Sequence, residues 1–221
     1  MTTARYDGLA EWYDREFAND GPARQAVLCL LGAGNGRLLD VGCGSGAHTA
    51  AIAERGWEVV GVDISEDLLE RARKRGIDVI NADATAVPFP DASFDAVVSM
   101  WTHTDVDDFG AVTCEVSRVL RRDGIFVYLG AHPCFVGPHS LYEGAIGVPQ
   151  LHAGQYRRSG RYTNAPGVSA SGLRAKVGAT HVPLASFIHA FVDAGFRIDH
   201  FEEPEAESRD FPYMIAIRAR P

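Results

Sequence analysis

The sequence predicts an α/β fold built on a mostly parallel sheet. From residue 37 to residue 129, apolar segments of strand length alternate with amphipathic segments of helix length. The segment 94–100 is nearly all apolar, as expected for a strand that helices cover on both faces. Because strands alternating with helices form right-handed βαβ units, this order predicts parallel strands between layers of helices.

Length and composition fit one folded domain over 1–221. Of the 221 residues, 46% are hydrophobic and 23% are charged, which is ordinary for a globular chain with a sizeable core. The formal net charge is −8 and no long Lys/Arg run is present, so nucleic acid is a poor candidate partner. We expect the short basic stretch 71–75 to face solvent at a helix C-terminus.

Cysteine usage and the N-terminal sequence favour a cytoplasmic protein without membrane contact. The cysteines form no CxxC pair and no regular spacing, so we expect reduced thiols. The first residues lack the apolar core of a signal peptide, and the apolar run 26–31 is too short to span a bilayer. The four cysteines are Cys29, Cys43, Cys114 and Cys134.

The first thirty residues predict helices that lie outside the sheet. Tyr6, Leu9, Trp12 and Tyr13 recur at spacings of three and four residues, which is the period of one helix face. Glycines at 32, 34 and 36 end this pattern. Ordinary core packing is the alternative role for Trp12 and Tyr13.

The region that follows divides into strands and helices in order. Ser65 is a suitable N-cap for the second of these helices, and Gly76 follows its end. A later helix has one apolar stripe and ends before Gly195. The predicted strands are 37–41, 58–62, 77–80, 94–100, 124–129, 196–202 and 213–218, and the predicted helices are 47–55, 66–75, 109–120 and 184–194.

The alternation fails between residues 131 and 182, a segment rich in Gly, Pro, His and Tyr. A compact domain seldom carries so long an irregular stretch without a functional reason. We predict that 131–182 is an inserted cap over an acceptor-binding pocket; a dimer contact or a surface excursion is the alternative. The residues expected to line that pocket are Phe135, Leu141, Tyr142, Ile146, Tyr156 and Tyr162.

A glycine-rich loop between the first strand and the first helix of the alternating region is the main functional signal. The run GCGSG at 42–46 allows a tight turn and a close approach of a ligand to the backbone. The helix that follows offers unpaired N–H groups to an anion. Since the segment also fits G-x-G-x-x-A, the loop by itself leaves a dinucleotide as an alternative ligand.

Acidic residues near the loop favour a nucleoside that carries an ammonium group. Asp40 precedes the first glycine by two residues, where its carboxylate would attract an ammonium and repel a pyrophosphate. Asp63 ends the second strand, where an acidic residue binds ribose hydroxyls with either ligand. Asp83 follows the third strand and can accept a hydrogen bond from an adenine amino group.

The runs LLDVGCGSG, VVGVDIS and NADATAVPFPDASFDAVVSM resemble the small class I S-adenosylmethionine-dependent methyltransferases, of the type 11-like group that acts on small molecules. The motifs agree with that family in order and spacing over about residues 5–130. The resemblance implies a three-layer Rossmann-like fold whose seven-stranded sheet has the order 3-2-1-4-5-7-6, with strand 7 antiparallel. It also implies S-adenosyl-L-methionine as cofactor and S-adenosyl-L-homocysteine as product.

Carried over to this chain, the resemblance assigns the cofactor contacts. It implies that Asp63 holds the ribose hydroxyls, that Ile64 packs on the adenine and that Met100 lies near the sulfonium. The segment 1–30 looks like the family's N-terminal lid. The residues expected to bind the cofactor are Tyr13, Asp40, Gly42, Cys43, Gly44, Asp63, Ile64, Asp83, Ala84 and Met100.

Two histidines are candidates for a catalytic proton acceptor. A base is needed only when the acceptor must lose a proton, because the sulfonium methyl is already activated. His103 lies three residues after Met100, and His132 follows the fifth strand, both at the edge where this fold binds ligands. A loop hydrogen bond is the alternative for His103, and a structural place at the start of the insert is the alternative for His132.

We expect no metal site, because the spacing of His132, Cys134, His139 and His152 matches no common one. The expected function is transfer of a methyl group to O, N or C of a small organic acceptor, and a homodimer is compatible with the sequence. Two other functions stay open. One is a non-catalytic or repurposed S-adenosylmethionine-binding domain; the other is an NAD-dependent oxidoreductase, against which Asp40 and Asp83 count.

Overall fold

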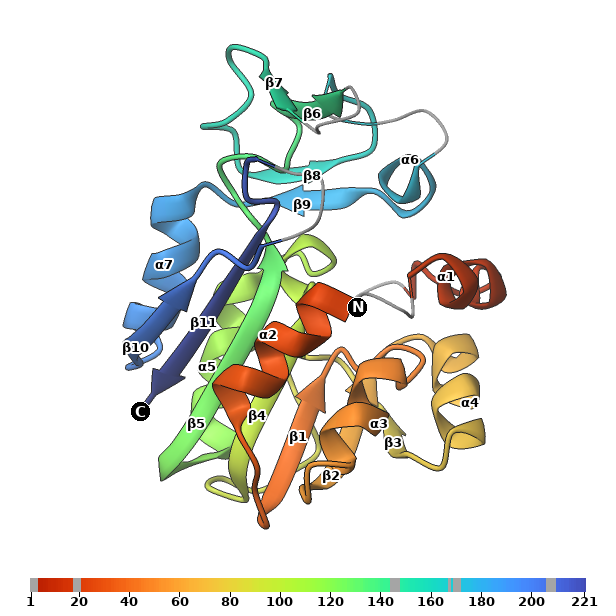
Figure 1. Cartoon of the computed structure of the whole chain (residues 1–221), viewed down its shortest axis with the longest axis vertical. Coiled ribbons are helices and arrows are strands. Elements are labelled where there is room, and N and C mark those ends of the chain that lie inside the picture. Colours follow the sequence, from red (N-terminus) through yellow and green to blue (C-terminus); the bar gives the residue numbers. More distant parts are fainter. Residues whose placement is uncertain (1–3, 18–20, 144–147, 167, 169–171, 206–209) are drawn as a thin grey trace.

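The computed structural model has a seven-stranded sheet at its centre (Figure 1). It describes residues 4–17, 21–143, 148–166, 168, 172–205 and 210–221. The sheet order is β10-β11-β5-β4-β1-β2-β3, and β11 runs antiparallel to both of its neighbours. The strands are β1 (Arg37–Val41), β2 (Glu58–Asp63), β3 (Asp78–Asn81), β4 (Phe94–Met100), β5 (Leu120–Ala131), β10 (Arg197–Glu202) and β11 (Met214–Arg220). The strand order and the antiparallel strand are therefore those that the family resemblance implies.

Helices cover both faces of this sheet and give the three layers. Helices α2 (Gly21–Leu31) and α3 (Ala47–Ala53) pack on one face, and α5 (Phe109–Val119) and α7 (Leu184–Asp193) pack on the other. Helix α4 (Glu66–Lys74) lies beside β2 and β3. Each face has its own apolar core, so the sheet is buried on both sides as the apolar strand β4 predicted.

Local sequence explains where these helices begin. The Ser65 hydroxyl accepts a hydrogen bond from the backbone N–H of Leu68 and caps α4, as predicted. The Asp108 carboxylate accepts one from Ala111 and caps α5 in the same way. Because both caps satisfy N–H groups that the first turn leaves unpaired, α4 and α5 begin at fixed positions directly beyond loops at the carboxyl edge of the sheet.

Strand β5 begins earlier than the sequence predicts. It starts at Leu120 and not at Gly124, because Leu120 pairs with Phe94 of β4 before the register shifts. The shift places Gly124 against the Asp95 carbonyl, which a Cβ atom would approach to 2.9 Å. The glycine that the sequence places at the start of a strand therefore lies at an irregularity inside that strand.

The insert lies beyond the carboxyl ends of β4 and β5 (Figure 1). It contains two small antiparallel sheets, β6 (Ser140–Glu143) with β7 (Val148–Leu151) and β8 (Gly160–Tyr162) with β9 (Ala179–His181), and the short helix α6 (Leu173–Val177). Helix α1 (Ala10–Phe17) lies at the same edge of the sheet, above α3 and α4. In the described part of the chain, no helix is both long and apolar enough to cross a membrane.

Glycines in left-handed backbone fix two turns next to α4. Gly46 and Gly76 have φ values of 77° and 78°, but only Gly46 is crowded: its Cβ would lie 2.9 Å from the Cβ of Ala72. We expect Gly76→Ala to lower the free energy of unfolding by ~1–2 kcal/mol through backbone strain alone. Gly46→Ala adds a clash and should cost ~2–4 kcal/mol. Urea unfolding of both variants measures this difference, and equal losses would contradict it.

Candidate functional site

A cavity opens at the carboxyl ends of β1, β2, β3 and β4, beneath the N-terminal segment. It holds about 750 Å³ of empty space, part of it at an open mouth. The predicted cofactor residues that line it are Tyr13, Gly42, Gly44, Asp63, Ile64, Asp83, Ala84 and Met100. Asp40 and Cys43 line a smaller cavity that shares Gly42 and Gly44 with the first. The fold therefore brings together residues from four strand ends that the sequence separates.

The glycine loop leaves room for a ligand at its own backbone. Gly42 and Gly44 have φ values of 77° and 53°, a conformation that side chains with a Cβ adopt only with strain. A Cβ at Gly42 would come within 2.9 Å of the Thr102 hydroxyl, whereas at Gly44 the nearest atom would be Leu68 at 4.0 Å. The open side at Gly44 is the cradle in which part of a ligand fits.

Asp63 presents a fixed carboxylate to the cavity. Its Oδ2 accepts a hydrogen bond from the backbone N–H of Gly44 at 2.9 Å, and its Oδ1 accepts one from Ser65 at 2.9 Å. Burial raises the pKa of Asp63, although these backbone N–H groups lower it. Each carboxylate oxygen retains a further lone pair, so Asp63 can accept hydrogen bonds from two adjacent hydroxyls.

Asp40 lies beneath the glycine loop and is 3% exposed. Its Oδ2 accepts a hydrogen bond from the Thr49 hydroxyl at 2.6 Å, and no cation pairs with it among the described residues. Burial raises the pKa of Asp40 to about 7; the Thr49 hydrogen bond lowers it and the charge of Asp63 raises it further. A ligand ammonium would supply the missing countercharge.

The far end of the cavity suits a flat, partly polar ring. Ile64, Leu68 and Val106 supply apolar walls. Asp83 stands at the edge, where its Oδ1 accepts hydrogen bonds from the N–H and hydroxyl of Thr85. Together with Asp63 and the glycine loop, this end fits an adenosine, and the donor set therefore fits the nucleoside cofactor that the resemblance implies.

The N-terminal segment is held over the cavity by polar contacts. The hydroxyls of Ser45 and Ser65 donate to Asp14 and Asp7, each at 2.6 Å. Arg75 pairs with Asp14 at 2.7 Å. Burial alone would raise the pKa of Asp14, but the hydrogen bonds from Arg75 and Ser45 outweigh it and hold the pKa below its usual range. Hydrogen bonds and ion pairs of this kind break at modest cost, so a lid function for 1–30 stays a prediction.

A second cavity adjoins the first, between the N-terminal segment and α6. It holds about 1140 Å³ of empty space, including its mouth. Four residues line both cavities, namely Tyr6, Tyr13, Trp101 and Asp105. The remaining residues of the second cavity are Glu16, Phe17, Gly21, Pro22, His48, Leu173, Arg174 and Tyr213. The two spaces therefore meet at a junction of three aromatic rings and one carboxylate.

The turn after β4 creates this junction, and no sequence pattern predicted it. Trp101 has φ 64° and ψ −1°, a left-handed conformation that is rare for a bulky residue and often marks a functional constraint. It leads into the 3₁₀ helix η1 (Thr102–Thr104). The Thr102 hydroxyl anchors this turn through Ser99 at 2.6 Å. Trp101 and Asp105, at the two ends of the turn, therefore both face the cavities.

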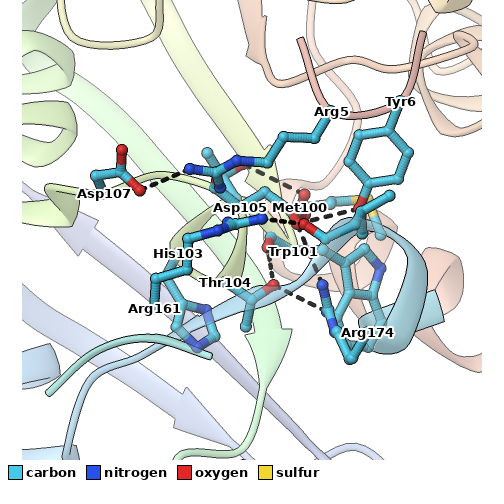
Figure 2. Close-up of polar contacts among 12 residues, drawn as sticks. Arg5, Tyr6, Met100, Trp101, His103, Thr104, Asp105, Asp107, Arg161 and Arg174 are labelled. Atoms are coloured by element: carbon cyan, nitrogen blue, oxygen red, sulfur yellow. Dashed lines mark hydrogen bonds and ion pairs between the residues drawn. The ribbon is translucent and has the colours of Figure 1, made fainter. Parts of the chain in front are cut away.

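Asp105 is the centre of the polar network at the junction (Figure 2). Its Oδ1 accepts hydrogen bonds from the Tyr6 hydroxyl at 3.0 Å and from Nη1 of Arg174 at 3.1 Å. Nη2 of Arg174 also donates to Thr104, and Nη1 of Arg5 donates to the Asp105 carbonyl. One carboxylate thus connects the N-terminal segment, the turn after β4 and the insert. No sequence motif pointed to it, because its partners are distant in sequence.

His103 does not reach the site, although its position after β4 suggested that it would. Its side chain is 3% exposed, hydrogen-bonds the Tyr128 hydroxyl and packs against Phe109 and Phe187. Burial, with a smaller contribution from Arg174, lowers its pKa to about 3. The left-handed turn at Trp101 directs His103 into the core, so the geometry gives no support to its assignment as a base, which stays a prediction.

His132 lies at the base of the insert and away from both cavities. Its Nε2 meets Glu203 at 2.9 Å, and its Nδ1 accepts from the N–H of Cys134. Burial lowers the pKa of His132, against the opposing effect of Glu203. In the described part of the chain no three His, Cys, Asp or Glu side chains are placed to hold a metal ion.

Two residues of the insert that were not among those predicted line the second cavity. Leu173 and Arg174 of α6 line it, whereas Phe135 packs on His132 and Tyr156 packs on His139. Ile146 and the side chains of Leu141 and Tyr142 lie outside the described residues. The contacts of Phe135 and Tyr156 thus lie within the insert itself, and the assignment of the acceptor pocket to the insert stays a prediction.

Comparison with known proteins identifies the family. Residues 39–128 match the family model described as a methyltransferase domain. The chain is 35% identical over 153 residues to the demethylmenaquinone methyltransferase of Tropheryma whipplei (strain Twist), covering 62% of this chain and 63% of that protein. It is 35% identical over 162 residues to the nocamycin O-methyltransferase of Saccharothrix syringae, covering 67% of this chain and 56% of that protein. The matches thus span somewhat less than two thirds of these relatives.

Among solved structures, an S-adenosylmethionine-dependent methyltransferase from Mesorhizobium loti has 28% sequence identity and a TM-score of 0.72, covering 97% of this chain and 99% of that one. Residues 39–128 therefore match a methyltransferase domain, and nearly the whole chain is similar to an S-adenosylmethionine-dependent methyltransferase. The predicted family and fold are confirmed, and the cofactor expected from the sequence is the one on which this family depends.

The buried charge of Asp40 generates a prediction for pH-dependent stability. Its pKa of about 7 in the folded chain, against 3.8 ordinarily, means that the folded state binds more protons between pH 4 and 7. Stability should therefore fall as pH rises through that window. Asp40→Asn removes the effect and should stabilise the ligand-free protein by roughly 2–4 kcal/mol at pH 8, and little at pH 4.5.

Denaturant unfolding at the two pH values measures this gain. The control is Asp78→Asn at an exposed position, which should show no comparable pH-dependent gain. A gain from Asp40→Asn that is the same at both pH values would contradict the assignment of a buried, high-pKa carboxyl.

Proposed function

We propose that this protein transfers the methyl group of S-adenosyl-L-methionine to a small organic molecule bound in the second cavity. The observation that carries the proposal is the junction at Tyr6, Tyr13, Trp101 and Asp105, where a cavity suited to a nucleoside meets a second, larger one. In-line transfer needs the donor and the acceptor to be aligned in adjacent spaces that exclude water.

The residues of the first cavity have complementary tasks in this proposal. Asp63 holds the ribose hydroxyls, Asp40 attracts the ammonium of the methionine moiety and the Gly44 backbone lies beside it. When bound, the cofactor supplies a methyl group on a positively charged sulfur. The family match, the strand-end carboxylates and the open face of the glycine loop support this arrangement.

Segment 1–30 acts as the lid, and segment 131–182 acts as the cap that selects the acceptor. Contacts of Asp7 and Asp14 with the loops after β1 and β2 support the lid. The two α6 residues in the second cavity support the cap. A reducing, cytoplasmic setting suits the cysteines, which are all free. An NAD-dependent oxidoreductase is disfavoured, because the Asp40 carboxylate would repel a pyrophosphate at the loop.

Calorimetry tests the cofactor assignment. We expect the chain to bind S-adenosyl-L-methionine and S-adenosyl-L-homocysteine and not NAD. Asp63→Asn should weaken both nucleosides by ~10-fold or more, because it removes charge-assisted hydrogen bonds to two hydroxyls. The exposed Asp78→Asn serves as the control. Tight NAD binding without binding of either nucleoside would refute the proposal, and a screen for acceptors that gain the mass of one methyl group would test transfer itself.

Filling the second cavity tests where the acceptor binds. Leu173→Trp places a large ring in that space and should reduce kcat/KM for an acceptor at least ~10-fold by steric exclusion, while the Kd of S-adenosyl-L-homocysteine changes less than about threefold. Leu151→Trp adds the same ring elsewhere in the insert, at a residue that is 64% exposed, and should leave both values unchanged. Unaltered turnover by Leu173→Trp would place the acceptor elsewhere.

A further inference from the structure

We infer that Asp105 accepts the proton of the methyl acceptor and that this acceptor is an aromatic molecule with a hydroxyl group. The inference rests on the proposed function, which it extends to a reacting residue and a substrate class. Three features carry it: the place of Asp105 between the cavities, the arrangement of its two carboxylate oxygens and the aromatic walls around it.

Asp105 is the one carboxylate that the described residues contribute to both cavities. Donor and acceptor must meet where the two spaces join, so a group at the junction can contact the acceptor atom that receives the methyl group. The histidines proposed from the sequence lie outside this junction. His48 lines the second cavity but not the first and is the competing candidate.

The carboxylate is held by one oxygen and open at the other. The hydrogen bonds from Tyr6 and Arg174 both reach Oδ1, and none of those found among the described residues reaches Oδ2. The side chain of Asp105 is 25% exposed, and it lines both cavities. An oriented carboxylate with an unoccupied oxygen is the geometry that a general base requires.

The electrostatic surroundings adjust the proton affinity of Asp105. Burial raises its pKa, and Arg174, Tyr6 and Arg5 lower it without cancelling that effect. The ion pair with Arg174 leaves the pair neutral, so an uncharged acceptor meets no uncompensated charge there. The ionisable groups on the surrounding elements that interact electrostatically with Asp105 are Arg5, Tyr6, Tyr13, Asp63, Tyr128, Arg161, Tyr162 and Arg174.

The walls of the second cavity fit a planar ring. Trp101 and Tyr213 lie nearly parallel, with 13° between their planes and 6.4 Å between their centroids. Phe17 and Tyr13 add a second pair of rings at 5.3 Å. Aromatic ligands pack on such surfaces by stacking and edge contacts, and a hydroxyl directed at Asp105 would fix the ring's orientation.

The reaction step then balances in atoms and charge. The hydroxyl of the acceptor gives its proton to Oδ2 of Asp105, and an electron pair of its oxygen forms the new bond to the methyl carbon. The carbon–sulfur bond breaks, and its electron pair stays on sulfur, which becomes neutral. The products are an aromatic methyl ether, S-adenosyl-L-homocysteine and protonated Asp105, which afterwards releases its proton to water.

Acceptors of graded acidity test the role of Asp105. With a series of substituted phenols and naphthols, Asp105→Asn should lower single-turnover transfer by ~10²–10⁴-fold for acceptors that are un-ionised at the assay pH. It should lower transfer much less for acceptors that are already ionised. The acidic limb of the wild-type pH profile should also disappear. The matched control is Asp107→Asn, two residues away, 66% exposed and outside both cavities.

A binding experiment gives a readout that does not depend on turnover. With S-adenosyl-L-homocysteine bound, wild-type protein should bind 4-nitrophenol in its neutral form and bind it more weakly as the phenol ionises, because Asp105 repels the phenolate. Asp105→Asn should shift this preference at least ~10-fold toward the phenolate, which absorbs visible light. An unchanged preference, or no binding of any phenol by wild type, would overturn the inference.

The remaining outcomes separate this inference from the proposed function. Full transfer by Asp105→Asn, an equal loss for ionised and un-ionised acceptors, or loss confined to His48→Gln would each overturn the role of Asp105 while the methyltransferase proposal stands. Failure of wild type to bind S-adenosyl-L-homocysteine would overturn both. Because Asp105→Asn leaves Arg174 without its counter-ion, the double variant Asp105→Asn/Arg174→Gln repeats the binding experiment without that buried charge.

Discussion

The withdrawal of carboxylates from water at the carboxyl edge of one sheet is the constraint on which the site depends. Asp63 and Asp105 line the first cavity, Asp40 lines the smaller cavity at the glycine loop, and burial raises the pKa of each. A buried carboxylate is costly unless hydrogen bonds or opposite charges offset the lost solvation. Each of the three carboxylates has different partners within the protein. The partner that each carboxylate still lacks is the group that we propose it contacts during binding or transfer.

Asp63 is satisfied by the backbone of its own loops, so it is rigid before any ligand arrives. Asp40 has only a hydroxyl partner and gains most from a cation. Asp105 is paired with Tyr6 of the N-terminal segment and Arg174 of the insert, so the charge around it depends on the positions of both segments. Separating Tyr6 or Arg174 from Asp105 would change the proton affinity of its carboxylate.

Sequence patterns were sufficient where position in the chain determines position in space. The glycine loop, Asp63 and Asp83 follow strand ends, and the carboxyl ends of parallel strands meet at one edge, so their gathering could be predicted. Trp101 and His103 show the opposite case. One residue with left-handed backbone turns the chain, so that Trp101 enters the site and His103, which was expected there, enters the core. No periodicity encodes that turn, and the pairing of Asp105 with Arg174 depends on an insert whose path the sequence did not reveal.

The division between the two cavities also explains why similarity to known proteins says more about the cofactor than about the acceptor. The family match spans residues 39–128, which contain the glycine loop and the acidic residues at the ends of β2 and β3. Among the described residues, the second cavity takes most of its lining from outside that range, from the N-terminal segment, α2, α6 and Tyr213, and from within it only His48, Trp101 and Asp105. Relatives with similar sequences carry names that give different acceptors, such as the demethylmenaquinone and nocamycin enzymes. The acceptor of this chain therefore has to be worked out from its own N-terminal segment, insert and junction, and Asp105 contacts both of those segments at the junction.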